Sequence, residues 1–254
     1  MATAAVVIIA GRVAQRVGPV LTSVLITLPF NAGPGFFFVS LDSPDAFVRE
    51  GALVAFATTG AVLVFCTAWV WAERWGGYLL SAGIGITGWV GVTFLVHQAP
   101  MSIPFAFAVV GAGALFAWVC RRRDLRKPEG VAAAAGWSFL VVRGAAAGLV
   151  VALVATASPW LGPVWSGFAL GFPTTLLASA WMLYGHYGRT FGAATLNAAQ
   201  PSLVVYASFA LALHLLTGPM PATAAVVVSF LGSAVMAAGL ALIVSRRRRR
   251  STPL

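Results

Sequence analysis

Charged side chains are scarce in this chain, and their scarcity excludes most water-soluble folds. Only 9% of the 254 residues are charged and only six are acidic, whereas 60% are hydrophobic. A soluble domain carries about 25% charged residues, so a soluble fold of this size could not cover its surface. At this apolar content the surrounding solvent must be lipid, and the chain is predicted to be an integral membrane protein.

The motifs of soluble enzymes and metal proteins are also missing. Cys66 and Cys120 lie 54 positions apart, which fits neither a metal-ligand spacing nor a disulfide framework. No Walker loop, Gly-x-Ser-x-Gly or His-Glu-x-x-His sequence occurs. The acidic residues all fall at the ends of apolar segments, so no carboxylate is available at depth. We therefore expect no enzyme activity, no cofactor and no metal.

What the sequence does contain is long apolar runs. Barrel strands alternate apolar and polar residues over roughly 10 positions, whereas these runs reach about 20 residues and are apolar on all sides. They predict an all-α fold, a polytopic transmembrane helical bundle of about nine spans. The expected spans are Ala2–Val13, Pro19–Ser40, Ala46–Ala72, Gly77–Val96, Ile103–Cys120, Val131–Thr156, Leu161–Tyr184, Phe191–Leu216 and Ala222–Ser245.

The basic residues between these segments predict the orientation of the bundle. With nine spans and a cytoplasmic C-terminus, 14 of the 16 basic residues fall on the cytoplasmic side, as the positive-inside rule requires. The net charge of +10 is thus a topology signal, and nucleic acid is not an expected partner. The Arg246–Arg250 run is expected to contact anionic lipid headgroups. The predicted location is the bacterial inner membrane, with the lipid bilayer as partner.

Four regions follow from the charge pattern: a first transmembrane repeat at 1–120, a basic cytoplasmic linker at 121–130, a second transmembrane repeat at 131–245 and a basic cytoplasmic tail at 246–254. The weak element is the first span, which has about half of the roughly 20 apolar residues that a crossing needs. It is either a half-helix or the remainder of a longer segment. An arrangement of eight spans with a cytoplasmic N-terminus stays open.

The two transmembrane regions resemble each other in sequence. Residues 18–29 (GPVLTSVLITLP) align with residues 162–173 (GPVWSGFALGFP) at an offset of 144, and residues 51–60 align with 192–201 at an offset of 141. The matched residues are mainly helix breakers at equal spacing. The first pair of aligned segments opens the second and the seventh predicted spans. Spans that are an even number apart cross the membrane in the same direction, whereas spans that are five apart cross it in opposite directions. The halves are therefore predicted to form an inverted-topology repeat, which is a recurring architecture of secondary transporters.

Two matched prolines, Pro29 and Pro173, lie about ten residues into their spans, near the middle of the bilayer at roughly 1.5 Å per residue. Each is expected to kink its helix and free a backbone carbonyl. Polar residues beside the breaks complete a predicted solute-binding site: Ser23, Asn31, Ser166 and Thr174. The alternative is that the prolines only shape helix packing, because proline is common in membrane helices.

Other polar residues at depth are candidate solute contacts, since such residues are costly in a membrane. Asn197 and Gln200 are three positions apart and share a helix face; the alternative is that they bond neighbouring helices together. Arg143 is the one charge well inside a span. It is either a counter-charge for an anionic solute or a side chain that snorkels to the cytoplasmic face.

The second half resembles the GlpM-like family of small bacterial inner-membrane proteins. The resemblance lies in Leu161-Gly-Pro, in Phe172-Pro-Thr174 and in Phe191-Gly-Ala with the later Pro201-Ser-Leu-Val-Val-Tyr206. It covers under a third of the chain, and the first half departs from it with Leu28-Pro-Phe30. The resemblance implies that the chain is a fused, inverted duplication, with a loose connection to exopolysaccharide production.

The function expected from these features is a secondary transporter or exporter of a small anionic or polar solute. The alternative is a membrane scaffold or accessory factor for envelope polysaccharide assembly, which would move no solute. The repeat favours transport, and the lack of a proton-coupling carboxylate at depth counts against it. Besides the solute and the bilayer, a second copy of the chain in a homodimer is the partner considered.

Overall fold

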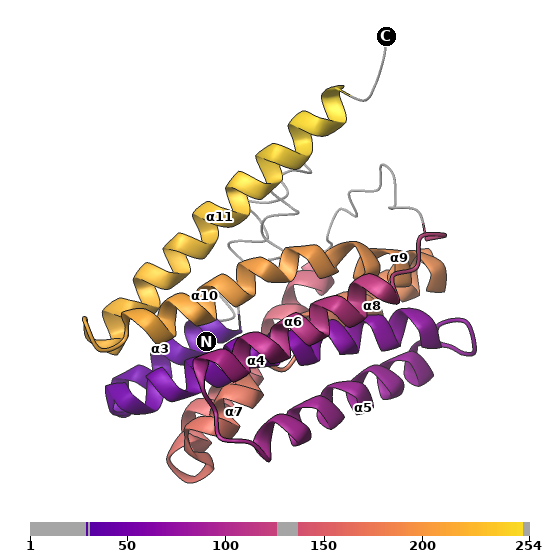
Figure 1. Cartoon of the computed structure of the whole chain (residues 1–254). Coiled ribbons are helices and arrows are strands. Elements are labelled where there is room, and N and C mark those ends of the chain that lie inside the picture. Colours follow the sequence, from indigo (N-terminus) through magenta and orange to yellow (C-terminus); the bar gives the residue numbers. More distant parts are fainter. Residues whose placement is uncertain (1–28, 30, 126–136, 251–254) are drawn as a thin grey trace.

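The computed structural model describes residue 29, residues 31–125 and residues 137–250, and that part of the chain is helical without a β-strand (Figure 1). Four helices are long and apolar enough to cross a membrane, at Asp45–Ala72, Tyr78–His97, Arg189–Leu216 and Ala222–Leu240. A fifth candidate is a pair bent by 42°, Val151–Leu170 with Thr174–Gly185. The described chain is therefore an all-helical protein of the membrane-spanning class, as its composition predicts.

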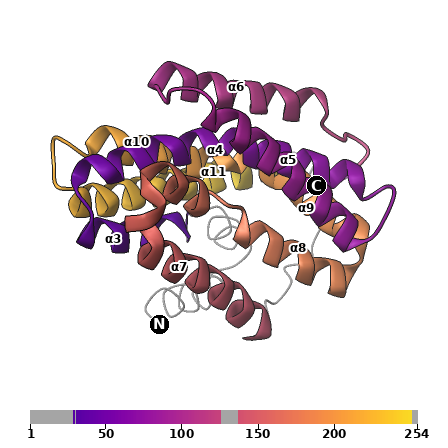
Figure 2. The same ribbon diagram turned by 90° about the horizontal axis from the view of Figure 1, so that it is seen from below.

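The first group of helices is α3 (Ala32–Asp42), α4 (Asp45–Ala72), α5 (Tyr78–His97) and α6 (Ile103–Val119). Helix α4 is the centre of the bundle, because 20 of its 28 residues are buried. A helix that is apolar on all sides is buried on all sides. Helices α3, α5 and α6 pack against α4, as do α7 (Trp137–Leu170) and α10 (Leu203–Leu216) from later in the chain (Figure 2).

The α4–α6 packing depends on two glycines. A Cβ atom built on Gly113 of α6 would lie 2.6 Å from the Cα atom of Gly60 in α4. The two backbones are therefore in direct contact, which small residues permit at helix interfaces in membranes. Gly111, two positions away on α6, has nothing within 4 Å of a Cβ position and takes no part in this contact.

The second group is α7 (Trp137–Leu170), α8 (Thr174–Tyr187), α9 (Arg189–Ala199), the 3₁₀ turn η1 (Gln200–Ser202), α10 (Leu203–Leu216) and α11 (Ala222–Arg250). Helix α11 continues to Arg250, five residues beyond the predicted end of the last span. In Figure 1 its C-terminal end extends away from the rest of the bundle. The turn η1 contains Pro201 and joins α9 to α10, so the predicted eighth span is present with a short 3₁₀ segment at its proline.

Helix α7 kinks one turn later than the break that the sequence predicted between Thr156 and Leu161. We expected a break at Ser158-Pro159, but the helix continues to a kink at Gly162, whose φ is 73°. Glycine adopts this left-handed conformation readily, and Pro163 follows it as the first residue of the next segment. Pro159 is tolerated inside the helix because the hydroxyl of Ser158 donates to the carbonyl of Ala155, 3.0 Å away, which is the carbonyl that a proline at 159 leaves without a backbone donor.

Contacts at the two ends of α4 set the directions of the second group. At its start, Asp45 Oδ1 accepts from the amide of Ala222 and the carbonyl of Arg49 lies 2.9 Å from His214 Nδ1. At its end, Glu73 pairs with Arg189. The α9–α10 span thus begins where α4 ends, and the two are antiparallel. Helices α5 and α11, which follow them through short turns, are antiparallel to each other for the same reason.

Candidate functional site

The first predicted break, at Pro29, falls at the start of α3, and the span expected before it lies outside the described residues. The carbonyl of Pro29 accepts from the amide of Gly33 at 2.8 Å, and the carbonyl of Asn31 accepts from the amide of Gly35 at 3.0 Å. Asn31 is 6% exposed, and its Oδ1 makes no hydrogen bond with a described group. Helix α3 therefore starts inside the protein and runs outward to Asp42, as a half-span would.

The second break lies between α7 and α8, at residues 171–173. Gly171 sits so close to α4 that a Cβ atom built on it would lie 2.2 Å from Oγ1 of Thr58. Phe172 packs edge-on against Trp89 of α5, with ring centroids 5.1 Å apart. Because Thr58 is at the middle of α4, this break is at half the height of the bundle, as predicted for Pro173.

The predicted chemistry of the Pro173 break is wrong in one respect. We expected the proline to leave a carbonyl free for solute. The carbonyl concerned belongs to Ala169, and it accepts from the amide of Phe172 at 3.2 Å. The carbonyl of Pro173 itself accepts from the amide of Leu177 at 3.0 Å. A tight turn and a new helix start therefore take up the carbonyls of Ala169 and Pro173.

The two breaks line one cavity of about 70 Å³. Asn31, Thr175, Ser202 and Tyr206 contribute polar side chains to its wall. Oδ1 of Asn31 is buried and makes no hydrogen bond with a described group, whereas the buried hydroxyl of Tyr206 interacts with the side chain of Thr58 in α4. Apolar side chains and backbone form the rest: Pro29, Ala32, Val62, Leu170, Gly171, Phe172, Pro173, Leu176, Ala199 and Leu203. We call this space the break cavity.

The break cavity contains three of the nine predicted site residues, Pro29, Asn31 and Pro173. Thr174 lies at the start of α8, where its hydroxyl is 3.4 Å from the carbonyl of Phe172, and its neighbour Thr175 reaches the cavity instead. Ser166 is buried on α7 with an unpaired hydroxyl but does not line the cavity. Ser23 lies outside the described residues. Arg143 belongs to α7, and its side chain also lies outside what the structure describes.

Asn197 and Gln200 lie away from the break cavity and bond neighbouring segments. Nδ2 of Asn197 donates to the carbonyl of Arg122 at 2.9 Å, and Nε2 of Gln200 donates to Oγ1 of Thr67 at 3.4 Å. These contacts match the interhelical alternative named for this pair. The solute role of the pair stays a prediction, and the break cavity gives it no support.

Sequence reasoning missed Ser202 and Tyr206 as cavity residues. Both follow Pro201, and they are four positions apart, so they share a helix face. That spacing was visible in the sequence. The sequence did not show that the start of α3 completes the cavity, because those residues lie more than 140 positions away in the chain.

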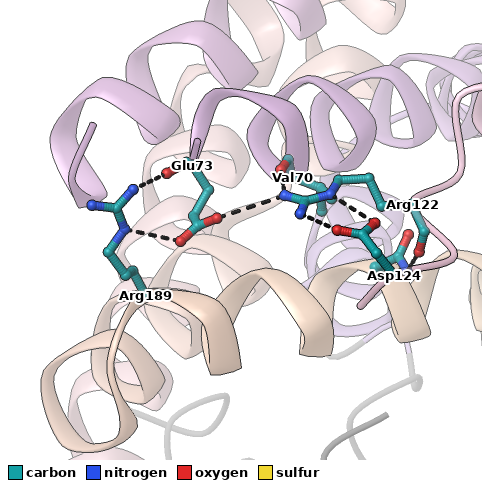
Figure 3. Close-up of polar contacts among 6 residues, drawn as sticks. Val70, Glu73, Arg122, Asp124 and Arg189 are labelled. Atoms are coloured by element: carbon teal, nitrogen blue, oxygen red, sulfur yellow. Dashed lines mark hydrogen bonds and ion pairs between the residues drawn. The ribbon is translucent and has the colours of Figure 1, made fainter. Parts of the chain in front are cut away.

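A second polar cluster lies where α4 ends, and it is built from charges (Figure 3). Glu73, with a side chain 8% exposed, pairs with Arg189 Nε at 3.0 Å and with Arg122 Nη1 at 3.7 Å. Both arginines also donate to backbone carbonyls of the last turn of α4, Arg122 to Val70 and Arg189 to Glu73. Cations are favourable at a helix C-terminus. We call Glu73, Arg122, Asp124 and Arg189 the ionic cluster.

Asp124 completes the ionic cluster from the loop after α6. Its carboxylate accepts from Nε and Nη2 of Arg122. This hydrogen bond holds the pKa of Asp124 below its usual value and raises that of Arg122. The sequence placed Arg122 in a topology signal and Glu73 at a span end, but it gave no sign that they meet.

The all-helical fold, its apolar spans and a polar cavity between two broken helices define the class of this protein as a helical membrane protein. No protein-family model matches the chain, and no curated protein or solved structure is significantly similar to it. The GlpM-like resemblance of the second half therefore stays a prediction.

Proposed function

We propose that this protein is a secondary transporter or exporter of a small polar solute across the bacterial inner membrane, and that the break cavity is its solute site. One observation carries the proposal: the start of α3, at Pro29 and Asn31, and the break between α7 and α8 line one cavity beside the middle of α4. Discontinuous helices that meet near the bilayer midplane form the solute sites of several transporter folds.

An inverted repeat of nine spans is the architecture that we propose with this function. Pro29 and Pro173 are 144 positions apart, and the same separation relates the start of α4 to the start of α9 and the start of α5 to the start of α11. The spans Asp45–Ala72 and Arg189–Leu216 have the same length of 28 residues and run in opposite directions. These matches support a duplication in which one half is inverted relative to the other.

The chemistry of the break cavity favours a polar, uncharged solute. Its described lining carries one amide and three hydroxyls, and none of those residues is ionised at neutral pH. A buried polar group without a partner costs about 1–3 kcal/mol, so Oδ1 of Asn31, which has no partner among the described residues, favours a ligand that donates a hydrogen bond. An anionic solute would need Arg143 as its counter-charge.

The central test is flux through the protein in liposomes. We would measure uptake of glycerol, glycine and lactate, as neutral, zwitterionic and anionic probes, with and without a proton gradient. The proposal expects flux of at least one uncharged probe. Tyr206→Phe should reduce that flux because it removes a hydroxyl without changing the ring, whereas Tyr184→Phe, a tyrosine outside the cavity, should not.

The scaffold alternative makes the opposite prediction. It expects no flux of any probe under any gradient, together with a protein that co-purifies from the envelope. Flux that is equal in the Tyr206→Phe and wild-type proteins would exclude the break cavity as the solute site.

The proposed orientation is tested separately with topology reporters. A reporter that is active only in the cytoplasm should work when fused after Lys127 or Leu254 and fail when fused after Asp45 or Pro100. Activity at Pro100 would contradict the nine-span arrangement and the inverted repeat together.

A further inference from the structure

Two cavities lie next to each other at the arginine-rich end of the bundle. The first, of about 310 Å³, has a polar wall that includes Arg121, Arg122, Arg123 and Asn197. The second, of about 300 Å³, is lined mainly by apolar side chains of α6 and α10. Trp118 and Arg121 belong to both walls. A polar chamber therefore adjoins an apolar channel, and we call the two together the α6 groove.

The α6 groove opens sideways, toward the lipid-facing surface. Trp118 and Val204, on its two sides, are 66% and 44% exposed. Helix α6 packs chiefly against α4, so its outer side leaves this space uncovered in the described part of the chain (Figure 2). In a membrane-spanning protein, large apolar residues exposed at such a position contact acyl chains.

The polar chamber holds positive charge that the ionic cluster does not neutralise. Arg122 is paired with Glu73 and Asp124. Arg121 and Arg123 are exposed and form no ion pair with a described residue. Oδ1 of Asn197, which is 5% exposed, also has no hydrogen-bond partner among the described groups. Among the described residues, the chamber thus offers two guanidinium groups without an ion-pair partner and a buried acceptor.

The length of the apolar channel fits one leaflet. Its wall on α6 extends from Val110 to Trp118, which is about 12 Å at a rise of 1.5 Å per residue, and Arg121 lies just beyond the end of the helix. Half of a typical hydrocarbon core is about 15 Å. An acyl chain whose headgroup sits at Arg121 would therefore reach the bilayer midplane along this channel.

We propose that the α6 groove binds one anionic phospholipid with a hydroxylated headgroup. The phosphate diester pairs with Arg121 and Arg123, a headgroup hydroxyl donates to Asn197, and one acyl chain occupies the apolar channel beside Ala114. Arginine suits this role because its planar fork binds phosphate oxygens in pairs. The site is separate from the break cavity and does not depend on the transport proposal.

The experiment is lipid retention by the full-length protein, measured by native mass spectrometry after purification with equal amounts of phosphatidylglycerol and phosphatidylcholine. The wild type should retain phosphatidylglycerol in preference. The double variant Arg121→Gln/Arg123→Gln should weaken that binding by roughly thirtyfold, as expected for two basic residues at a lipid headgroup. Arg74→Gln, which removes an exposed charge at the same end but outside the groove, should change it little.

A second pair of variants tests the acyl chain. Ala114 lies in the channel, whereas Ala112 is exposed on another side of the same helix. Ala114→Trp should displace the lipid by filling the channel, and Ala112→Trp should leave it bound. Both variants keep the arginines, so a loss in Ala114→Trp alone can only come from the channel.

Two outcomes would overturn the proposal. If inorganic phosphate or glycerol 1-phosphate competes fully and Ala114→Trp has no effect, the chamber is a site for soluble phosphate. If Arg74→Gln weakens retention as much as the double variant does, the preference reflects diffuse surface charge. If the double variant is unstable, the Ala114→Trp and Ala112→Trp comparison still decides between the outcomes.

Discussion

The ionic cluster and the break cavity both connect α4 to the second half of the chain, but they treat buried polar groups in opposite ways. In the ionic cluster, Glu73 has two arginine partners, and those arginines also take up carbonyls at the end of α4. In the break cavity, Oδ1 of Asn31 has no described partner. The ionic cluster therefore stabilises the fold, whereas the break cavity offers an unpaired polar atom to a ligand.

The largest effect should come from breaking the ionic cluster. Glu73→Ala leaves Arg122, whose side chain is 10% exposed, without its buried carboxylate partner. Removing one member of a buried pair costs about 3 kcal/mol or more, so the free energy of unfolding in detergent should fall by about that much. Glu50→Ala, at an exposed carboxylate near the other end of α4, is the control and should be nearly neutral. Equal losses of unfolding free energy in the two variants would show that the ionic cluster stabilises the fold no more than an exposed carboxylate does.

The break between α7 and α8 should be the next most sensitive to substitution. Gly171→Ala puts a methyl group against Thr58, a short branched side chain that cannot move aside. Overpacking of this kind costs about 1–3 kcal/mol, and it should also lower flux because it pushes the break away from α4. Gly185→Ala in α8 meets nothing within 4 Å. It should be neutral or slightly stabilising, since alanine is favoured over glycine in helices.

The paired prolines separate function from stability. Pro29→Ala and Pro173→Ala should each reduce flux by roughly tenfold, which corresponds to about 1.4 kcal/mol, while thermal stability stays unchanged. Because both breaks line one cavity, the double variant should lose less than the sum of the two single losses. Full activity in both single variants would show that the prolines only shape packing.

The smallest effect should be the pH dependence of the Asp124 contact. Its pKa is lowered by the hydrogen bond from Arg122, so the ionised carboxylate stabilises the folded state. That contribution is present above the usual aspartate pKa and is lost as the pH falls through the lowered value. The melting temperatures of wild type and Asp124→Asn should differ slightly near pH 7 and converge in strong acid. A difference in melting temperature that grows on acidification would contradict a stabilising role of the ionised Asp124 carboxylate.

Much of the fold could be predicted because the bilayer is a demanding solvent. Apolar runs of about 20 residues can satisfy their backbone in lipid only as helices, and turn residues mark where those helices stop. The start of α5 and the ends of α4 and α10 lie within one residue of their predicted positions. The position of the kink in α7 was not predicted, because the hydroxyl of Ser158 compensates for the hydrogen bond that Pro159 removes. Rules for local helix breakers do not include such a contact.

The sequence by itself determined that this protein is helical and that its spans are apolar, and it predicted a helix break at residue 173, where α7 and α8 are separated. Local composition and spacing decide such features. Only the tertiary structure decided which polar residues share a site. It brought Asn31 and Tyr206 to one cavity and sent Asn197 and Gln200 to helix contacts elsewhere. It also joined Glu73 to Arg122 and Arg189. The reason is that such contacts depend on how distant helices are rotated and set against one another, and no local pattern in a chain encodes that rotation directly.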